Sequence, residues 1–148
     1  MSGGIGGQIA MSIKILVVDD DPDILQLTRL TLERAGFTVR AAAGGLDAIE
    51  RLKSETPDLV ILDVMMPQIS GWEVLDFLKN NEATAAVPVL LMTARDRPDE
   101  VEVGYEYGAR YYLAKPWTRR QLLHGIGVAL GRPDLMEAGS ADRGPGKS

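Results

Sequence analysis

The feature that most constrains this chain is a series of five short apolar runs separated by segments with helical periodicity. The runs span residues 13–18, 38–41, 59–62, 87–92 and 111–114. The run at 59–62, LVIL, is apolar at every position, as expected for a strand that is buried on both faces of a sheet. Strands that alternate with helices are joined in parallel by crossover connections. The sequence therefore predicts an α/β fold: a doubly wound, five-stranded parallel sheet with helices on both faces.

The segments between these runs carry helix start and stop signals. Asp21 and Pro22 open the first helix, as N-cap and first helical residue, and Gly36 closes it. Its predicted buried face consists of residues at spacings of three and four: Ile24, Leu27, Thr31 and Ala35. Later helices are predicted over 45–54, 71–80, 97–107 and 118–130. The last begins with a capping box, in which Thr118 and Gln121 satisfy each other's backbone N–H groups.

Length and composition indicate a single folded unit. A chain of 148 residues with 45% hydrophobic residues is long enough for one globular core and short for two. Residues 1–12 contain four glycines without periodicity, and residues 131–148 are rich in Gly, Pro and charge. We therefore expect a flexible leader at 1–12, one domain at 13–130 and a flexible C-terminal tail at 131–148.

Composition also excludes several classes of function. The chain has no cysteine, which rules out disulfides and cysteine-based metal or redox sites. No apolar run approaches the ~20 residues of a membrane span, and the N-terminus lacks the pattern of a secretory signal. A net charge of -5 is unfavourable for a nucleic-acid surface. We expect a cytoplasmic protein that binds neither membranes nor nucleic acid.

Polar side chains follow four of the predicted strands at their carboxyl ends. Asp19 and Asp20 follow the first strand. Asp63 follows the third strand, Thr93 the fourth and Lys115 the fifth. In a doubly wound sheet these ends share one edge, and ligands bind just outside that edge. We therefore expect three carboxylates, a hydroxyl and an ammonium group to converge on one site.

Such a site suits a divalent cation and a phosphoryl group. Crowded carboxylates repel one another unless a cation compensates, and oxygen donors without His or Cys favour Mg²⁺. With two carboxylates on the metal, Asp63 is the candidate nucleophile toward a phosphoryl group. Mg²⁺, the Lys115 ammonium and the Thr93 hydroxyl would then meet the charge on the phosphoryl oxygens.

Four separated motifs, ILVVDDD, LVILDVMMPQISG, LLMTAR and YYLAKPW, resemble the receiver domain of two-component response regulators in order and spacing. The resemblance covers nearly all of residues 13–130 and is to the single-domain, chemotaxis-regulator-like form. It implies a flavodoxin-like fold with strand order 2-1-3-4-5. It also implies a signalling function in a phosphorelay, in which a histidine kinase or a histidine phosphotransfer protein donates the phosphoryl group. Such a domain catalyses only its own phosphorylation and dephosphorylation and is not otherwise an enzyme.

The resemblance assigns roles to the residues at the predicted edge. It makes Asp63 the phosphoacceptor and a metal ligand, Asp20 a direct Mg²⁺ ligand, and Asp19 a ligand through water. The backbone carbonyl of Met65 would complete the protein's share of the coordination. Lys115 would pair with the phosphoryl group.

The resemblance also implies a switch and a signalling face. Thr93 and Tyr112 would be the switch pair, with the hydroxyl drawn toward the phosphate and the ring turning inward behind it. The peptide bond between Lys115 and Pro116 would be cis. A downstream protein or a second copy of the chain would bind the face formed by residues 97–130. The tyrosines at 105 and 107 either pack against the sheet or belong to this face.

Four positions matter for how this chain differs from others of the family. Arg110 and Tyr111 stand where an acidic pair is common, and Trp117 replaces the usual Phe after Lys-Pro. Met65, two residues beyond the predicted phosphoacceptor, occupies a position that tunes dephosphorylation by shaping the access of water. An apolar Met there favours a long-lived phosphoryl group.

The acidic residues within 19–23 have a structural interpretation in part. Two other functions also remain as alternatives. Asp21 and Asp23 are expected only to start a helix. A phosphorylation-independent interaction module of the same fold is opposed by the complete set of predicted site residues. A metal-dependent phosphatase would use Asp19 and Asp21 as its nucleophile motif. The absence of a following Gly-Thr and of a cap domain opposes that reading.

Overall fold

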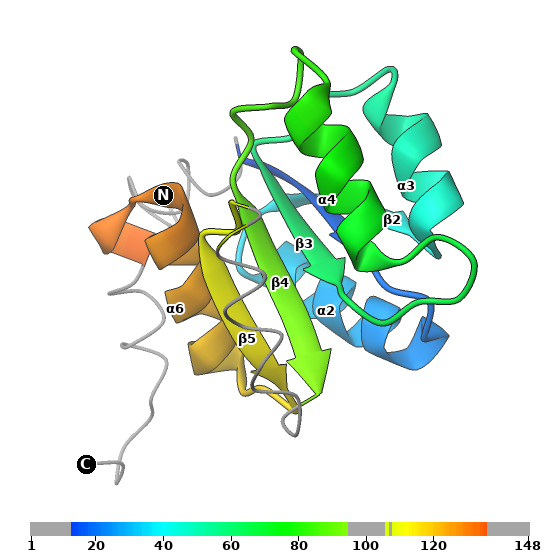
Figure 1. The fold of residues 1–148 in the computed structure, drawn as a ribbon. Helices are drawn as coiled ribbons and strands as arrows, with labels where there is room; N and C mark the ends of the chain where they lie inside the picture. The colour runs from blue at the N-terminus through cyan, green and yellow to red at the C-terminus, as the bar shows by residue number, and fades with distance from the viewer. Residues whose placement is uncertain (1–12, 95–105, 107, 136–148) are drawn as a thin grey trace, which may run out of the picture.

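The computed structural model describes residues 13–94, 106 and 108–135, which form a five-stranded parallel sheet flanked by helices (Figure 1). The strands are β1 (Lys14–Val18), β2 (Thr38–Ala42), β3 (Leu59–Asp63), β4 (Val89–Ala94) and β5 (Tyr111–Lys115). The helices are α2 (Pro22–Arg34), α3 (Gly45–Leu52), α4 (Gly71–Asn80) and α6 (Arg119–Leu130). The strand order is β2-β1-β3-β4-β5, and every pairing is parallel. The predicted fold class and the 2-1-3-4-5 order are confirmed.

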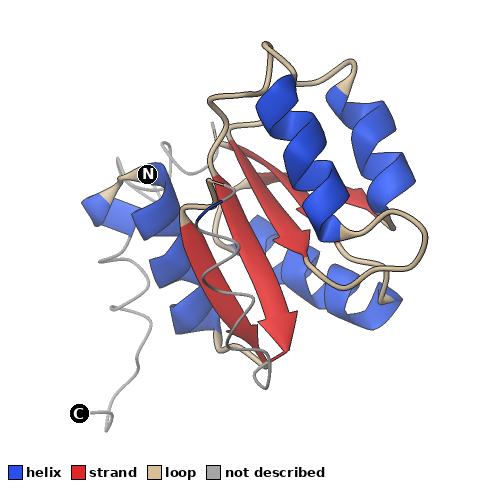
Figure 2. Ribbon diagram, in the orientation of Figure 1, coloured by secondary structure: helices blue, strands red, loops and turns tan. Residues whose placement is uncertain are grey.

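Helices cover both faces of this sheet (Figure 2). On one face, Leu32 of α2 and Ile126 of α6 belong to one hydrophobic core. On the other, Leu52 of α3 and Leu75 of α4 belong to a second core. Successive residues of β1 alternate between the two cores, and β3 is buried at all five of its positions. Burial of β3 on both faces is what the uniformly apolar LVIL run predicts.

The predicted helix signals are present at the helix ends. The Asp21 side chain accepts hydrogen bonds from the first two N–H groups after Pro22, at 3.0 and 3.4 Å, and Pro22 is the first residue of α2. At α6 the predicted capping box forms between Thr118 and Gln121. Gly131 ends α6 with φ 66°, a left-handed conformation that favours glycine.

The buried face of α2 differs from the predicted one. Leu27, expected to face the core, is 52% exposed, and the buried residues of this helix are Thr28 and Leu32. Thr28 can be buried because its hydroxyl donates a hydrogen bond to the carbonyl oxygen of Ile24 at 2.7 Å. The prediction was wrong at Leu27 because periodicity alone does not distinguish the stripe through Thr28 and Leu32 from the neighbouring stripe on the helix.

Several predicted element boundaries also differ from the observed ones by one or two residues. The helix predicted at 45–54 ends at Leu52. The strand predicted at 87–92 begins at Val89, because Pro88 has no N–H group with which to join the ladder. The helix predicted at 97–107 lies outside the described residues except for Glu106, and so do Tyr105 and Tyr107.

The packed part of the chain extends beyond the last long helix. Leu135, in the segment expected to be a tail, is only 6% exposed and belongs to the core beneath α6. Within the described ranges, none of the helices has the length and apolar character needed to cross a membrane.

Candidate functional site

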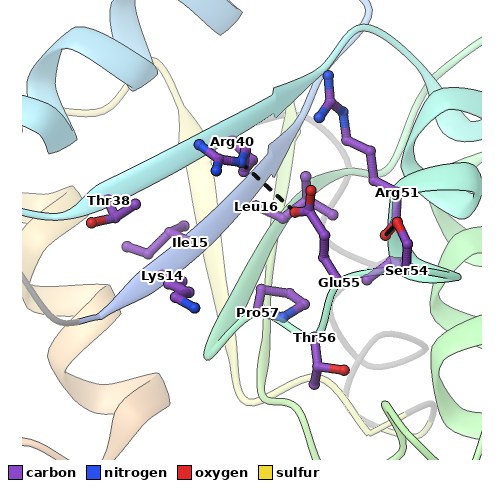
Figure 3. Close-up of a pocket in the computed structure, with 11 residues that line it drawn as sticks. Lys14, Ile15, Leu16, Thr38, Arg40, Arg51, Ser54, Glu55, Thr56 and Pro57 are labelled. Atoms are coloured by element: carbon purple, nitrogen blue, oxygen red, sulfur yellow. Dashed lines mark hydrogen bonds and ion pairs between the residues drawn. The ribbon is translucent and has the colours of Figure 1, made fainter.

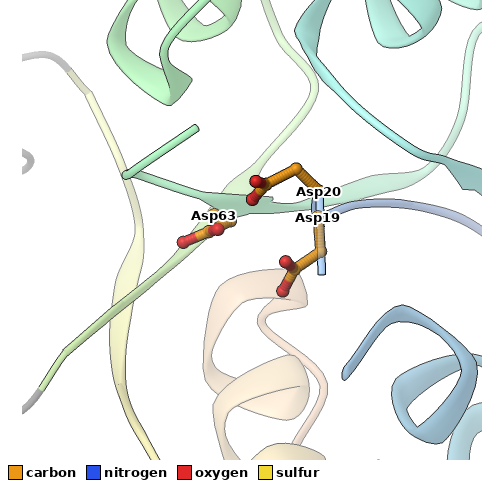
Figure 4. Close-up of side chains that lie close together, drawn as sticks. All are labelled: Asp19, Asp20 and Asp63. Atoms are coloured by element: carbon orange, nitrogen blue, oxygen red, sulfur yellow. The ribbon is translucent and has the colours of Figure 1, made fainter. Parts of the chain in front are cut away.

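Three carboxylates converge at the carboxyl edge of the sheet (Figure 4). Asp19 and Asp20 follow β1, and Asp63 is the last residue of β3. These two strands pair in register, with Val18 opposite Leu62, so their carboxyl ends lie side by side. One oxygen from each of the three carboxylates lies within 4.8 Å of the others. The structure therefore brings together the three acidic residues that the sequence predicted at this edge.

Asp19 is held by hydrogen bonds to both of its carboxylate oxygens. It is completely buried. Its Oδ1 accepts a hydrogen bond from the backbone N–H of Asp21 at 2.9 Å, and its Oδ2 accepts one from Nζ of Lys115 at 3.1 Å. Asp20 beside it is exposed. One carboxylate of the run is thus fixed inside the site, and the next is open to solvent.

Lys115 connects the far edge of the sheet to this acidic group. It is the last residue of β5, and its Nζ also lies 3.5 Å from Oδ1 of Asp63. Burial alone would lower the pKa of the Lys115 ammonium, but the carboxylates of Asp63 and Asp19 outweigh it, and the pKa is raised. Lys115 is therefore a permanent cation of the site. The peptide bond that follows it, to Pro116, is cis, as the resemblance implied.

Among the described residues at this edge, Asp63 has the most strongly shifted pKa. Burial raises its pKa, the negative charge of Asp19 raises it further, and the nearby Lys115 cation only partly compensates. The pKa of Asp63 is raised from the usual 3.8 to about 7. The backbone N–H of Met65, which donates to Oδ1 of Asp63 at 3.4 Å, opposes the rise weakly. A strongly perturbed carboxyl group at a ligand-binding edge is typical of a functional site.

The predicted switch residues lie on neighbouring strands with their side chains toward the same face. Thr93 of β4 is opposite Ala114 of β5, and Tyr112 is two residues before Ala114. Thr93 is 3% exposed, whereas Tyr112 is partly buried against the core on the α4 side. The register therefore permits the expected communication between the hydroxyl and the ring.

Met65 lies just beyond Asp63 with its side chain 49% exposed. Single exposed apolar side chains are common on protein surfaces, so the exposure of Met65 does not by itself indicate a function. Its position is consistent with the predicted influence on the access of water to Asp63.

Gly71, the first residue of α4, was missed by sequence reasoning. A Cβ atom at this position would overlap the carbonyl oxygen of Asp63 and the Cα of Val64. The backbone N–H of Gly71 donates to the carbonyl oxygen of Val64 at 3.0 Å, which closes the loop between β3 and α4. A motif ending in Ser-Gly was visible in the sequence, but only the folded chain shows that its glycine packs against the residue that carries the chemistry.

The site fits a hard divalent cation. Its described donors are carboxylate oxygens at separations that one ion can bridge, and no histidine or cysteine is part of the group. Mg²⁺ prefers such donors and needs only one or two carboxylates because it retains several waters. The excess of negative charge, which one lysine does not balance, also favours a bound cation.

Comparison with known proteins identifies the family. A family model described as the response regulator receiver domain matches residues 15–126. Among curated proteins, the response regulator MprA of Mycobacterium ulcerans (strain Agy99) is 39% identical over 132 residues, which is 89% of this chain and 56% of that protein. The alkaline phosphatase synthesis transcriptional regulatory protein PhoP of Bacillus subtilis (strain 168) is 36% identical over 88% of this chain and 53% of its own length. The chain thus spans about half the length of these curated relatives.

Solved structures agree with this assignment. The chemotaxis protein CheY4 of Vibrio cholerae superimposes with a TM-score of 0.76 at 31% sequence identity, covering 80% of this chain and 98% of that one. A response regulator receiver domain protein from Clostridium thermocellum gives a TM-score of 0.74 at 32% identity, covering 84% of this chain and 98% of that one. The sheet order, the acidic edge and the sequence matches lead to one conclusion: this chain belongs to the response regulator receiver domain family.

Proposed function

We propose that this receiver domain accepts a phosphoryl group on Asp63 in a Mg²⁺-dependent reaction. The observation that carries the proposal is the placement of Asp63. Its carboxylate lies beside those of Asp19 and Asp20, and its Oδ1 is 3.5 Å from the Lys115 ammonium. The donor would be a histidine kinase or a histidine phosphotransfer protein, as the family implies.

Asp19, Asp20, Asp63 and the backbone carbonyl of Met65 are the groups that would hold Mg²⁺. When bound, the ion supplies positive charge that keeps the carboxylates ionised and offsets charge on the phosphoryl oxygens. Asp19 is suited to a water-mediated role because both of its oxygens already accept hydrogen bonds from the protein. Asp20 is exposed and free to turn toward an ion.

The protein's own groups divide the remaining work of phosphoryl transfer. A carboxylate oxygen of Asp63 forms a bond to phosphorus as the bond between phosphorus and the donor's leaving atom breaks. Asp63 must be ionised for this attack, and because its raised pKa of about 7 leaves it only partly ionised at neutral pH, a nearby cation would favour the reactive form. Lys115, which already lies beside Asp63, would hold a phosphoryl oxygen, and Thr93 would donate its hydroxyl to another.

The output is proposed to be a change in protein binding. Movement of the Thr93 hydroxyl toward the phosphoryl group would leave space behind it for the Tyr112 ring, which shifts a two-state equilibrium. The partner-binding face would lie within residues 97–130. The net charge of -5 makes a protein partner more favourable than a nucleic acid. We place this domain, residues 13–130 with Leu135 packed against its core, in the cytoplasm, where a kinase-driven phosphorelay operates.

The phosphatase alternative loses support from the role of Asp21. That reading requires the second acid of an Asp-x-Asp motif to act in catalysis. The Asp21 side chain instead accepts hydrogen bonds from two backbone N–H groups of α2. The domain is therefore proposed to act as a signalling module that catalyses only its own phosphorylation and dephosphorylation.

Incubation with acetyl phosphate and Mg²⁺ tests the proposal. Intact-mass spectrometry should show one phosphoryl group, stable in acid and labile in base, which is lost on Asp63→Asn. Asp58→Asn is the matched control, since Asp58 lies at the opposite edge of the sheet beside Lys14, and it should be labelled normally. Labelling that survives Asp63→Asn, or that never occurs, would overturn the proposal, and steady hydrolysis of unrelated phosphoesters would favour the phosphatase.

The lifetime of the phosphoryl group is a second property of the same site. The exposed, apolar side chain of Met65 cannot orient an attacking water by hydrogen bonding. We propose that the phosphorylated state is long-lived for this reason. Met65→Asn should shorten the half-life measured after removal of the donor, and an unchanged half-life would contradict the role of Met65.

A further inference from the structure

A cavity of about 360 Å³ lies at the amino edge of the sheet, where the strands begin (Figure 3). Its floor is formed by the first residues of β1 and β2, where Lys14 pairs with Thr38 and Leu16 with Arg40. Its wall is the end of α3 and the segment 54–57. The cavity exists because α3 has only 8 residues and stops at Leu52, so it does not cover the beginning of the two strands.

The cavity combines a partly apolar lining with a charged mouth. Leu16 and Leu52 lie at its base but are only 2% and 3% exposed, so the apolar surface open to a ligand is that of the half-buried Pro57 and the aliphatic stems of Lys14 and Arg40. At the mouth, Arg40 and Glu55 point toward one another (Figure 3), with Nε of Arg40 3.9 Å from Oε1 of Glu55. This combination of an apolar surface with a small number of placed polar groups is characteristic of small-molecule sites.

The Arg40–Glu55 pair is weak enough to be replaced. Its two side chains are 58% and 44% exposed, and an ion pair of that length in water contributes little. Arg51 also lines the cavity, but its Nε lies 3.5 Å from Asp47 on the preceding turn of α3. Arg40 is therefore the lining arginine whose guanidinium a ligand could take over.

The charge of the lining favours an anion. Lys14, Arg40 and Arg51 carry positive charge and Glu55 carries negative charge, whereas the whole chain has a net charge of -5. A guanidinium presents a planar fork of N–H donors that matches a carboxylate better than an ammonium does. The volume lies at the low end of the range for ligand sites, which suits a molecule of one ring rather than a nucleotide.

We propose that this cavity binds a small carboxylate with an apolar, ring-sized body. The body lies against Pro57 and the aliphatic stems of Lys14 and Arg40, and the carboxylate takes the place of Glu55 on the Arg40 guanidinium. Binding is noncovalent, and it occurs at the edge of the sheet opposite Asp63. The site is therefore independent of the phosphoryl chemistry, and Asp63→Asn should leave its affinity unchanged.

An NMR titration of the ¹⁵N-labelled full chain with benzoate tests the proposal. Saturable shifts should appear in the amides of residues 14–16, 38–40 and 52–56. Benzamide, which keeps the ring without the charge, and acetate, which keeps the charge without the ring, should each bind at least about tenfold more weakly. Shifts centred on Lys115, equal affinity for benzamide, or no saturable shift at all would overturn the proposal.

Two variants with opposite expected effects make the test sharper. Arg40→Gln should weaken benzoate binding by about tenfold or more, because it removes the charged donor. Glu55→Gln should strengthen it by about two- to fivefold, because it removes the anion that competes for Arg40. Arg29→Gln is the matched control, since Arg29 forms a comparable exposed pair with Glu33 on α2, at the other face of the sheet. Equal affinities in the Arg40 variant and the control would contradict the site.

Discussion

Nζ of Lys115 lies 3.1 Å from Oδ2 of Asp19, although the two residues are 96 positions apart in the sequence. Asp19 is fully buried, and the Lys115 side chain is only 24% exposed, so water screens this pair less than a surface ion pair. The same ammonium also lies 3.5 Å from Asp63. The single Lys115 ammonium thus lies close to two carboxylates, and Asp20 adds a third. The site therefore carries more negative than positive charge.

Addition of Mg²⁺ should raise the melting temperature of the protein. The ion relieves repulsion among the three carboxylates and binds the native state only, so it stabilises the fold by mass action, by about 2.7 kcal/mol at 100 times its Kd. Asp20→Ala should remove most of this gain. Differential scanning calorimetry with and without Mg²⁺ measures both effects.

Asp23→Asn is the control for this comparison. Asp23 is an exposed residue in the first turn of α2, outside the acidic group. Its substitution should cost about 0.3–1 kcal/mol through the helix dipole and leave the Mg²⁺ gain intact. A full Mg²⁺ gain in Asp20→Ala would contradict the assignment of the metal site.

Lys115→Gln should raise the pKa of Asp63 above its value of about 7 in the unmodified protein. The lysine is the main group that lowers this pKa, and glutamine keeps most of the side-chain length without the charge. Titration of the Asp63 carboxyl carbon by NMR, in the metal-free protein, measures the change. Lys14→Gln, at the opposite edge, should leave the titration unchanged. A lower pKa in Lys115→Gln would contradict the electrostatic account of the site.

The stability of the metal-free protein should depend on pH through Asp63. Because the folded-state pKa is raised from 3.8 to about 7, the folded chain binds a proton in this range that the unfolded chain releases. The free energy of unfolding contributed by Asp63 is therefore fully present below pH 3.8 and is lost as the pH rises to about 7. Asp63→Asn should lack this component.

Urea denaturation in the presence of a chelator measures this pH dependence. The difference in the free energy of unfolding between the two proteins isolates Asp63 from the other carboxyl groups. Relative to the unmodified protein, Asp63→Asn should gain stability steadily between about pH 4 and pH 7. A difference that is constant or has the opposite slope would contradict the raised pKa of Asp63.

Gly71→Ala should destabilise the protein and disturb Asp63. The added methyl group would overlap the Asp63 carbonyl oxygen and the neighbouring backbone, and such overpacking typically costs about 1–3 kcal/mol. Gly44→Ala is the matched control, because nothing lies within 4 Å of a Cβ at that position. Its cost should be limited to weaker capping of α3, about 0.5–1 kcal/mol. Equal losses in the two variants, measured by chemical denaturation, would argue against a close contact at Gly71.

The sequence was sufficient for the sheet and for the set of acidic residues at its edge. The uniformly apolar run ending at Leu62 indicated a strand buried on both faces, and parallel strands place their carboxyl ends together. The strand order came from the family resemblance rather than from the pattern of residues. Asp19, Asp63 and Lys115 could be grouped from these two sources without knowing any distance between them.

The remaining features depend on tertiary packing. The exposed Leu27 and the buried Thr28 on α2 reverse the usual preference, because a threonine that bonds its own helix can be buried and periodicity alone does not choose between adjacent stripes. The raised pKa of Asp63 requires its burial and its neighbours to be known. The role of Gly71 depends on the path of the loop that brings α4 back to Asp63.

The most direct test of the central claim is to locate the phosphoryl group on the chain. Treatment of the acetyl phosphate-labelled protein with borohydride reduces an aspartyl phosphate to homoserine, which tandem mass spectrometry can assign to one position. The account predicts homoserine at position 63 and unmodified aspartate at 19, 20 and 21. Homoserine at one of those three positions, or none at position 63 in a labelled protein, would contradict it.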